Sequence, residues 1–189
     1  MIFLLRWATT FLAFPLGGFL VLPLTPVQNP MTGALVGAVT GTVLGLAQWW
    51  ALRGKVDWRW AAATAAATTL GTSAAVAVTG GPVSTGSAVV TGLVGGAVVG
   101  AAQAMLLRRG IARSTAWAAV VSLSWGLAWF LTANVITDVS DGFAIFGAGG
   151  AAAATLITGL ALAAIFRVRP ASAATVPAAG AATVVSPVR

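Results

Sequence analysis

The chain has no cysteine, histidine, glutamate or tyrosine among its 189 residues, and its only acidic residues are Asp57, Asp138 and Asp141. Without cysteine, neither a disulfide framework nor a thiolate metal site can form. The acids lie in short connections, and no side chain is a nucleophile with a base beside it, so the usual parts of a catalytic site are missing. We therefore expect a protein that is not an enzyme and that uses no metal and no cofactor.

Charge is also scarce in this sequence. Only 7% of the residues are charged and 59% are hydrophobic, whereas a soluble domain carries about 25% charged residues. This composition predicts a membrane protein. The net charge of +7 favours contact with anionic lipid headgroups, so membrane lipids are expected partners. Nucleic acid is not an expected partner, because a protein that binds it needs basic residues on a soluble face.

Apolar stretches of about 20 residues, the length a helix needs to cross the hydrocarbon layer, occur six times. They cover approximately residues 2–24, 31–53, 60–79, 87–107, 115–135 and 143–166. The first resembles a signal peptide, but no A-x-A-like cleavage site follows it, so we expect an uncleaved span. The predicted fold class is all-α, a polytopic membrane helical bundle of six transmembrane helices over residues 1–169, with a flexible cytoplasmic tail at 170–189.

The connections between these spans alternate in charge. Residues 25–30, 79–86 and 137–142 are rich in turn formers and contain no lysine or arginine. The basic residues fall on the other side, at Arg6, Arg53, Lys55, Arg59, Arg108, Arg109, Arg113, Arg167, Arg169 and Arg189. By the positive-inside rule that side is the cytoplasm. We expect a multi-pass protein of the cell (inner) membrane with both termini cytoplasmic.

The even-numbered spans repeat one pattern of small residues. Aligned on Arg53, Arg108 and Arg167, they match at Gly45, Gly100 and Gly159; at Gly41, Gly96 and Thr155; at Gly37, Gly92 and Ala151; and at Gly33, Ala88 and Gly147. The pattern predicts three helical hairpin repeats, at about 1–55, 56–112 and 113–169, parallel in topology and related by a pseudo-threefold axis. An odd number of parallel repeats does not fit the inverted repeats of many secondary transporters.

Glycine at every fourth position indicates close packing between helices. Glycine costs a helix about 1 kcal/mol relative to alanine, but small residues at this spacing let a neighbouring backbone approach in lipid. The candidate packing residues are Gly33, Gly37, Gly41, Gly45, Gly92, Gly96, Gly100, Gly147 and Gly159. We expect them to meet an odd-numbered span of the same or the adjacent hairpin. The alternative is a glycine groove that holds a lipid tail or a pigment.

Two glutamines occupy equivalent places in the first two repeats. Gln48 and Gln103 each follow a packing glycine by three residues and lie five residues before the terminal arginine, so they are near the cytoplasmic edge. One interpretation is an interhelical hydrogen bond. The other is a polar constriction around a central path, although the third repeat has Leu162 at this place.

Two further groups of side chains are candidates for a site. Thr64, Thr68 and Thr72 form a stripe on the third span; their hydroxyls can bond back to the helix backbone or line a water-filled cavity. Trp125 and Trp129 share one face of the fifth span. They either pack in the core or stack against a flat apolar ligand such as a quinone or a carotenoid.

The unit G-x-x-Q-W-W-x-L-R at 45–53 is echoed by GAAQAMLLR at 100–108. It resembles the repeated hairpin motif of functionally uncharacterised bacterial multi-spanning membrane proteins. The resemblance covers the six spans but not the tail, and it implies topology and no activity. The second copy lacks the tryptophans and the third, GLALAAIFR, lacks the glutamine, so a role carried by those residues is not threefold.

Two functional hypotheses follow from these patterns. The leading one is a non-enzymatic integral membrane protein, a structural or accessory component packed by glycine-zipper helices, with other membrane subunits or a second copy of itself as partner. The alternative is a small channel, transporter or carrier of a lipophilic ligand, with a path lined by Gln48, Gln103 and the threonines of the third span.

Overall fold

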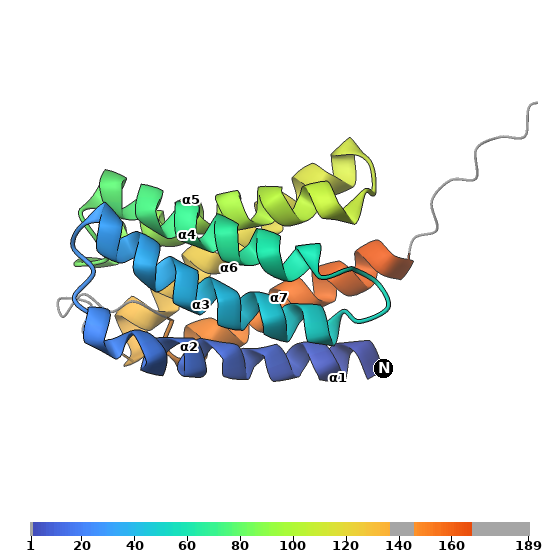
Figure 1. The fold of residues 1–189 in the computed structure, drawn as a ribbon, viewed down its shortest axis with the longest axis horizontal. Coiled ribbons are helices and arrows are strands. Elements are labelled where there is room, and N and C mark those ends of the chain that lie inside the picture. Colours follow the sequence, from blue (N-terminus) through green and yellow to red (C-terminus); the bar gives the residue numbers. More distant parts are fainter. Residues whose placement is uncertain (1, 137–145, 168–189) are drawn as a thin grey trace, which may run out of the picture.

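The computed structural model describes residues 2–136 and 146–167 (Figure 1). Within these residues, six helices are long and apolar enough to cross a membrane: Phe3–Leu24, Pro30–Ala51, Arg59–Thr79, Thr85–Leu107, Ile111–Asn134 and Ala148–Arg167. The all-α bundle of six membrane-spanning helices is therefore confirmed, and the chain is a multi-pass membrane protein. The predicted tail at 170–189 and the acids Asp138 and Asp141 lie outside the described residues.

The first span is assembled from α1 (Ile2–Ala8), the 3-10 turn η1 (Thr9–Leu12), α2 (Ala13–Val21) and the 3-10 turn η2 (Leu22–Leu24). The others are α3 (Pro30–Ala51), α4 (Arg59–Thr79), α5 (Thr85–Leu107), α6 (Ile111–Leu131) with the π-helical turn η3 (Thr132–Ile136), and α7 (Ala148–Arg167). The first span is irregular because Pro15 has no N–H to donate to the carbonyl one turn earlier, which falls within η1.

Some of the turn formers in the connections without basic residues cap the neighbouring helices. The Asn29 side chain accepts from the Thr32 N–H at 3.0 Å, and the Ser84 hydroxyl accepts from the Ser87 N–H at 3.2 Å. Both belong to capping boxes that satisfy free N–H groups at the start of α3 and α5. Gly80 ends α4 in the left-handed conformation, with φ of 75°.

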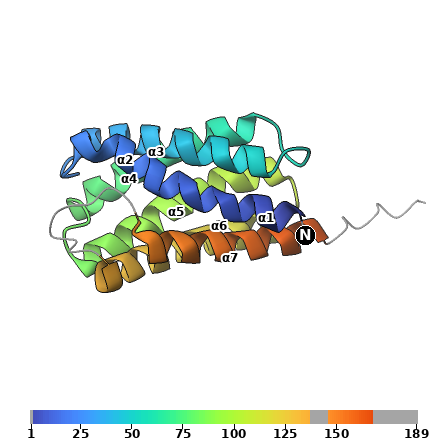
Figure 2. The ribbon, with the colours of Figure 1, turned by 90° about the horizontal axis from the view of Figure 1, so that it is seen from below.

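The six spans form a closed ring in chain order. Each span packs against the next one, from α2 with α3 through to α6 with α7, and the first span returns to pack against α7. Figure 2 shows α1 lying along α7, the closing contact of the ring. The six spans therefore surround a common interior, to which residues far apart in the sequence contribute.

The described basic residues gather at one end of the bundle. The connections α3–α4 and α5–α6 lie at the same end as the N-terminus and the last turn of α7 (Figure 1). There the Lys55 ammonium lies 4.9 Å from the centroid of the Phe166 ring, and the Arg109 guanidinium lies 5.7 Å from it. We call this the basic end, and the end that carries the α2–α3 and α4–α5 connections the far end.

Candidate functional site

Helix α3 lies directly on α4 at its four predicted packing residues, Gly33, Gly37, Gly41 and Gly45. A Cβ atom added to Gly37 would lie 2.6 Å from the carbonyl oxygen of Thr68, and one on Gly45 would lie 2.6 Å from the carbonyl oxygen of Ala61. At Gly41 the added atom would lie 2.6 Å from the Thr68 Cβ. These distances are too short for any side chain, so the approach of the two helices depends on glycine.

Helices α5 and α6 meet in the same way. Gly92, Gly96 and Gly100 all face α6. A Cβ on Gly96 would lie 2.8 Å from the Cα of Ser122, and one on Gly100 would lie 2.8 Å from the Cα of Ala118. For α3 and α5, the span that meets the glycines is therefore the one that follows in the chain, in the adjacent predicted hairpin.

The sixth span differs from the other two even-numbered spans. Gly159 faces the indole of Trp7, a side chain of α1, rather than a bare backbone. Gly147 precedes the first residue of α7, and its N–H donates to the Thr132 hydroxyl at 3.0 Å. Gly147 thus lies in the connection just before α7 and is not a residue of the helix.

The two glutamines are hydrogen-bonded to each other. The Gln103 amide nitrogen donates to the Gln48 side-chain oxygen at 2.9 Å and to the Thr64 hydroxyl at 2.9 Å. The Trp60 indole N–H donates to the same Gln48 oxygen at 3.1 Å. Gln103 is only 1% exposed. We call these four side chains the glutamine network; it ties α3, α4 and α5 together inside the bundle.

Three tryptophans fill the interior at the level of this network. Trp7, Trp60 and Trp117 are almost completely buried, and the rings of Trp60 and Trp117 lie 6.5 Å apart. They belong to one core cluster with Leu52 and Leu162. Leu162 stands where the third repeat lacks the glutamine, and it is fully buried. Bulky apolar side chains therefore occupy the interior on the side of the basic end.

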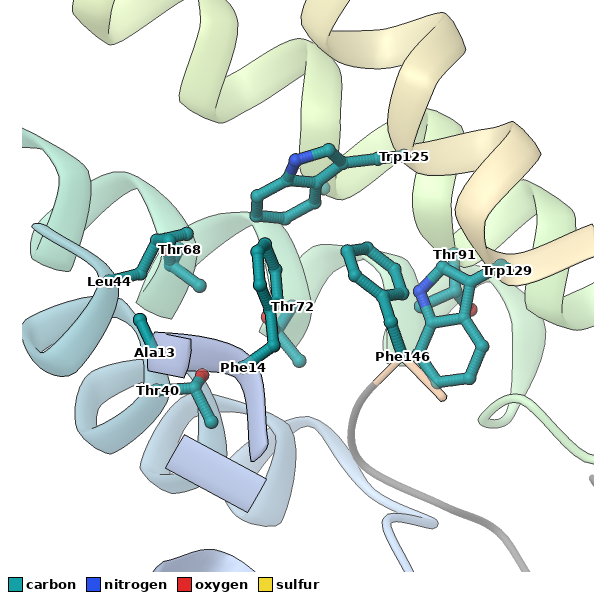
Figure 3. Close-up of a pocket in the computed structure, with 11 residues that line it drawn as sticks. Ala13, Phe14, Thr40, Leu44, Thr68, Thr72, Thr91, Trp125, Trp129 and Phe146 are labelled. Carbon is teal, nitrogen blue, oxygen red and sulfur yellow. The ribbon is translucent and has the colours of Figure 1, made fainter. Parts of the chain in front are cut away.

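Further from the basic end, the interior contains a cavity of about 70 Å³. Figure 3 shows its walls, which come from the first five spans and from Phe146, two residues before α7. The lining residues are Ala13, Phe14, Thr40, Leu44, Thr68, Thr72, Thr91, Gly95, Trp125, Trp129 and Phe146. We call it the aromatic cavity.

Four aromatic rings line one side of the aromatic cavity. Phe146 meets Trp125 edge-on at 5.6 Å and Trp129 edge-on at 5.5 Å, and its ring lies 5.3 Å from that of Phe14. Figure 3 shows the two indoles on either side of Phe146, with the Phe14 ring pointing toward Trp125. Trp125 and Trp129 thus do not stack on each other. Each presents part of its ring to the cavity.

The threonine stripe of the third span is divided between two places. Thr68 and Thr72 line the aromatic cavity, whereas Thr64 belongs to the glutamine network. The Thr68 hydroxyl donates to the Thr64 carbonyl at 2.7 Å, and the Thr40 hydroxyl, also in the cavity wall, donates to a carbonyl of its own helix at 2.8 Å. These hydroxyls therefore have partners without water or ligand.

A second, much smaller cavity of about 10 Å³ lies beside the aromatic cavity, and Phe14 and Trp125 line both. Its walls also include both glutamines and Thr10, Thr158, Thr155 and Trp117. Within the described residues, the Trp117 indole nitrogen and the Thr155 hydroxyl are buried without a hydrogen-bond partner. We call it the polar cavity.

The chemistry that both cavities offer is that of amide, hydroxyl, indole and hydrocarbon groups. Asp57 lies at the basic end on an exposed connection, 4.0 Å from the Arg59 guanidinium. Among the described residues, no cluster of side chains is suited to hold a metal ion. The residues that line the two cavities are therefore all uncharged.

Comparison with known proteins finds no matching family model, no matching curated protein and no matching solved structure. The resemblance carried by the G-x-x-Q-W-W-x-L-R motif stays a prediction. The candidate site consequently rests on the geometry of the two cavities and the glutamine network.

Sequence reasoning missed Phe14, Phe146, Thr40 and Thr91 as cavity residues. None of them belongs to a repeated motif or a stripe of similar side chains. Phe14 and Phe146 meet only because the ring of helices closes between the first span and the last. A single sequence has no local signal for a contact across such a distance in the chain.

Proposed function

We propose that the protein is a non-enzymatic membrane carrier that holds a small, flat, lipophilic molecule in the aromatic cavity. The observation that supports the proposal is the cavity itself, lined by Phe14, Trp125, Trp129 and Phe146 in the middle of the bundle. Binding sites for small molecules are mainly apolar and aromatic, with a few polar groups. Of the two hypotheses drawn from the sequence, the carrier form of the second fits this interior best.

The contrast with the packing elsewhere strengthens the proposal. Protein interiors are normally packed to the density of organic crystals, and the α3–α4 and α5–α6 contacts leave no room even for a Cβ. A cavity bordered by four aromatic rings in the same bundle is therefore a departure from an otherwise dense interior. An engineered apolar cavity of about 150 Å³, roughly twice this volume, stays dry and accepts benzene.

The wall chemistry indicates the class of ligand. The hydroxyls of Thr40 and Thr68 already donate within their own helices, so they do not require a polar ligand. The indole and phenyl rings favour contact with a flat ring, face to face or edge to face. A monocyclic aromatic compound, or the ring of a quinone, has the corresponding chemistry.

We further propose that the basic end faces the cytoplasm and that the protein lies in the cell inner membrane. The positive-inside rule supports this orientation, because the basic residues of the connections lie at one end of the bundle. The aromatic cavity includes Trp129, near the end of α6, and Thr91, near the start of α5. The cavity therefore extends from the middle of the bundle toward the far end, and we expect a ligand to enter from that side.

The proposal is tested with toluene and the pair of variants Gly95→Ala and Gly86→Ala. A Cβ at Gly95 would lie 3.6 Å from the Trp125 ring, an ordinary contact that takes space from the cavity, whereas at Gly86 it would meet nothing within 4 Å. Toluene titrated into the detergent-solubilised protein is expected to shift the ¹⁵N indole signals of Trp125 and Trp129. Gly95→Ala is expected to weaken this binding about fivefold, equivalent to ~1 kcal/mol, and Gly86→Ala to leave it unchanged.

Signals that shift equally for the exposed Trp49, Trp50 and Trp58, with no difference between the variants, would show that toluene only enters the detergent. That outcome contradicts the carrier proposal. Because Gly95→Ala replaces a glycine within a helix, it is expected to stabilise α5 rather than unfold it. A loss of binding can then be assigned to the cavity.

A second candidate function, a structural or accessory membrane component, is favoured by the backbone contacts at Gly37, Gly41 and Gly45. Helices held this closely form a stable bundle that other subunits can pack against. This candidate predicts no response of Trp125 or Trp129 to toluene and an unchanged fold in Gly95→Ala. The toluene titration thus separates the two functions.

A further inference from the structure

The three buried tryptophans at the level of the glutamine network differ in what their indole N–H groups meet. Trp60 donates to the Gln48 side chain at 3.1 Å, and Trp7 donates to the carbonyl oxygen of Thr155 at 2.9 Å. The Trp117 nitrogen has no partner within the described residues, although the side chain is only 1% exposed. Trp117 lines the polar cavity.

A second unpaired group borders the same cavity. The Thr155 hydroxyl is buried, in a residue 7% exposed, and also lacks a partner among the described residues. The neighbouring Thr158 hydroxyl, by contrast, donates to the Ala154 carbonyl at 2.6 Å. In a membrane interior, an unpaired polar group has no surrounding water to bond with, and the cost is several kcal/mol. Two such groups, on residues that line one cavity, therefore indicate a missing partner.

The size of the cavity limits what that partner can be. At about 10 Å³, the polar cavity matches the space of roughly 10–15 Å³ that one water molecule needs. An indole N–H only donates, so the partner must accept a hydrogen bond, whereas the Thr155 hydroxyl can donate or accept. A single oxygen atom satisfies both groups.

We propose that the polar cavity is a binding site for one hydrogen-bonding oxygen atom, which accepts from the Trp117 indole and pairs with the Thr155 hydroxyl. In the ligand-free protein this oxygen belongs to a bound water molecule. Phe14 and Trp125 line both cavities, so the carbonyl oxygen of a ligand in the aromatic cavity can take the same place. This last statement alone rests on the proposed carrier function.

The water site is tested by a double-mutant cycle with Trp117→Phe and Thr155→Val, measured as thermal unfolding in detergent. Thr155→Val keeps the shape of the side chain and removes the hydroxyl. It is expected to lower Tm by about 2–4 °C, because the bound water loses a partner. In the Trp117→Phe background the same change is expected to have a smaller effect, since the bridge is already broken.

Thr158→Val is the matched control, because its hydroxyl lines the same cavity but is already paired. It is expected to change Tm by less than Thr155→Val. An unchanged or raised Tm for Thr155→Val would overturn the proposal, because removing a truly unpaired hydroxyl is neutral or stabilising. Strict additivity of the Trp117→Phe and Thr155→Val effects would overturn it as well.

The source of the oxygen is distinguished by ¹⁵N indole spectra of the intact protein. The Trp117 signal, identified by its loss in Trp117→Phe, is expected to show a nuclear Overhauser effect to water in the ligand-free protein. Benzaldehyde, which carries a carbonyl, is expected to shift this signal and remove that effect, whereas toluene leaves both unchanged. If the Trp117 indole proton shows no nuclear Overhauser effect to water and its signal does not shift with benzaldehyde, the site does not exist.

Discussion

At the scale of the residue, Gln103 joins three helices through one amide group. Its nitrogen donates to Gln48 of α3 and to Thr64 of α4, both at 2.9 Å. Interhelical hydrogen bonds of this kind contribute about 0.6–2 kcal/mol in membranes. Gln103 is thus a point where the ring of helices is fixed by polar contact rather than by close packing.

We predict that Gln103→Leu lowers the free energy of unfolding by about 1–2 kcal/mol. The leucine loses both hydrogen bonds, although the Gln48 oxygen keeps the indole N–H of Trp60. Denaturant unfolding in detergent measures the change, with the exposed Gln28→Leu as control. Equal effects of the two variants would mean that the network contributes nothing to stability.

At the scale of the element, the α3–α4 pair depends on the absence of side chains along one face of α3. We predict that Gly41→Leu lowers the free energy of unfolding by about 3 kcal/mol, because overfilling a packed contact forces the helices apart. The Cβ alone would already lie 2.6 Å from the Thr68 Cβ. Gly86→Leu, where an added Cβ meets nothing within 4 Å, is the control for a bulky residue in a membrane helix.

A thermal melt in detergent is sufficient to compare these two variants. If Gly41→Leu melts at the temperature of the native chain, α3 and α4 are not in direct contact at Gly41. Gly86→Leu is expected to melt close to the native temperature, since the residue is exposed in the first turn of α5.

The elements themselves and the glycine faces of α3 and α5 could be predicted from the sequence, but the side-chain contacts across the interior could not. Span lengths follow from apolar runs, and turn formers such as Asn29 and Ser84 mark where helices begin. That Gln48 and Gln103 bond to each other depends on α3 and α5 both packing against α4. Such contacts are set by tertiary packing, which leaves no pattern in one sequence.

At the scale of the whole molecule, the orientation in the membrane can be determined by labelling single introduced cysteines. The chain has no native cysteine that would also react. We predict that a membrane-impermeant maleimide labels Val83→Cys from the outside of intact cells and labels Lys55→Cys only after the membrane is opened. Both positions are exposed and lie in connections at opposite ends of the bundle. Labelling in the reverse order would place the basic end outside.

The closure of the ring between the first span and the last has a consequence for the order of the chain. The rings of Phe3 and Phe166 lie 6.0 Å apart, and the Trp7 indole is bonded to Thr155, 148 residues later. Since the described ends of the bundle are neighbours, a circularly permuted gene that joins them and opens the chain at Gly54 would encode a bundle with the same helix neighbours. The α1–α7 contact, formed last during synthesis of the native chain, would then become a contact between consecutive helices.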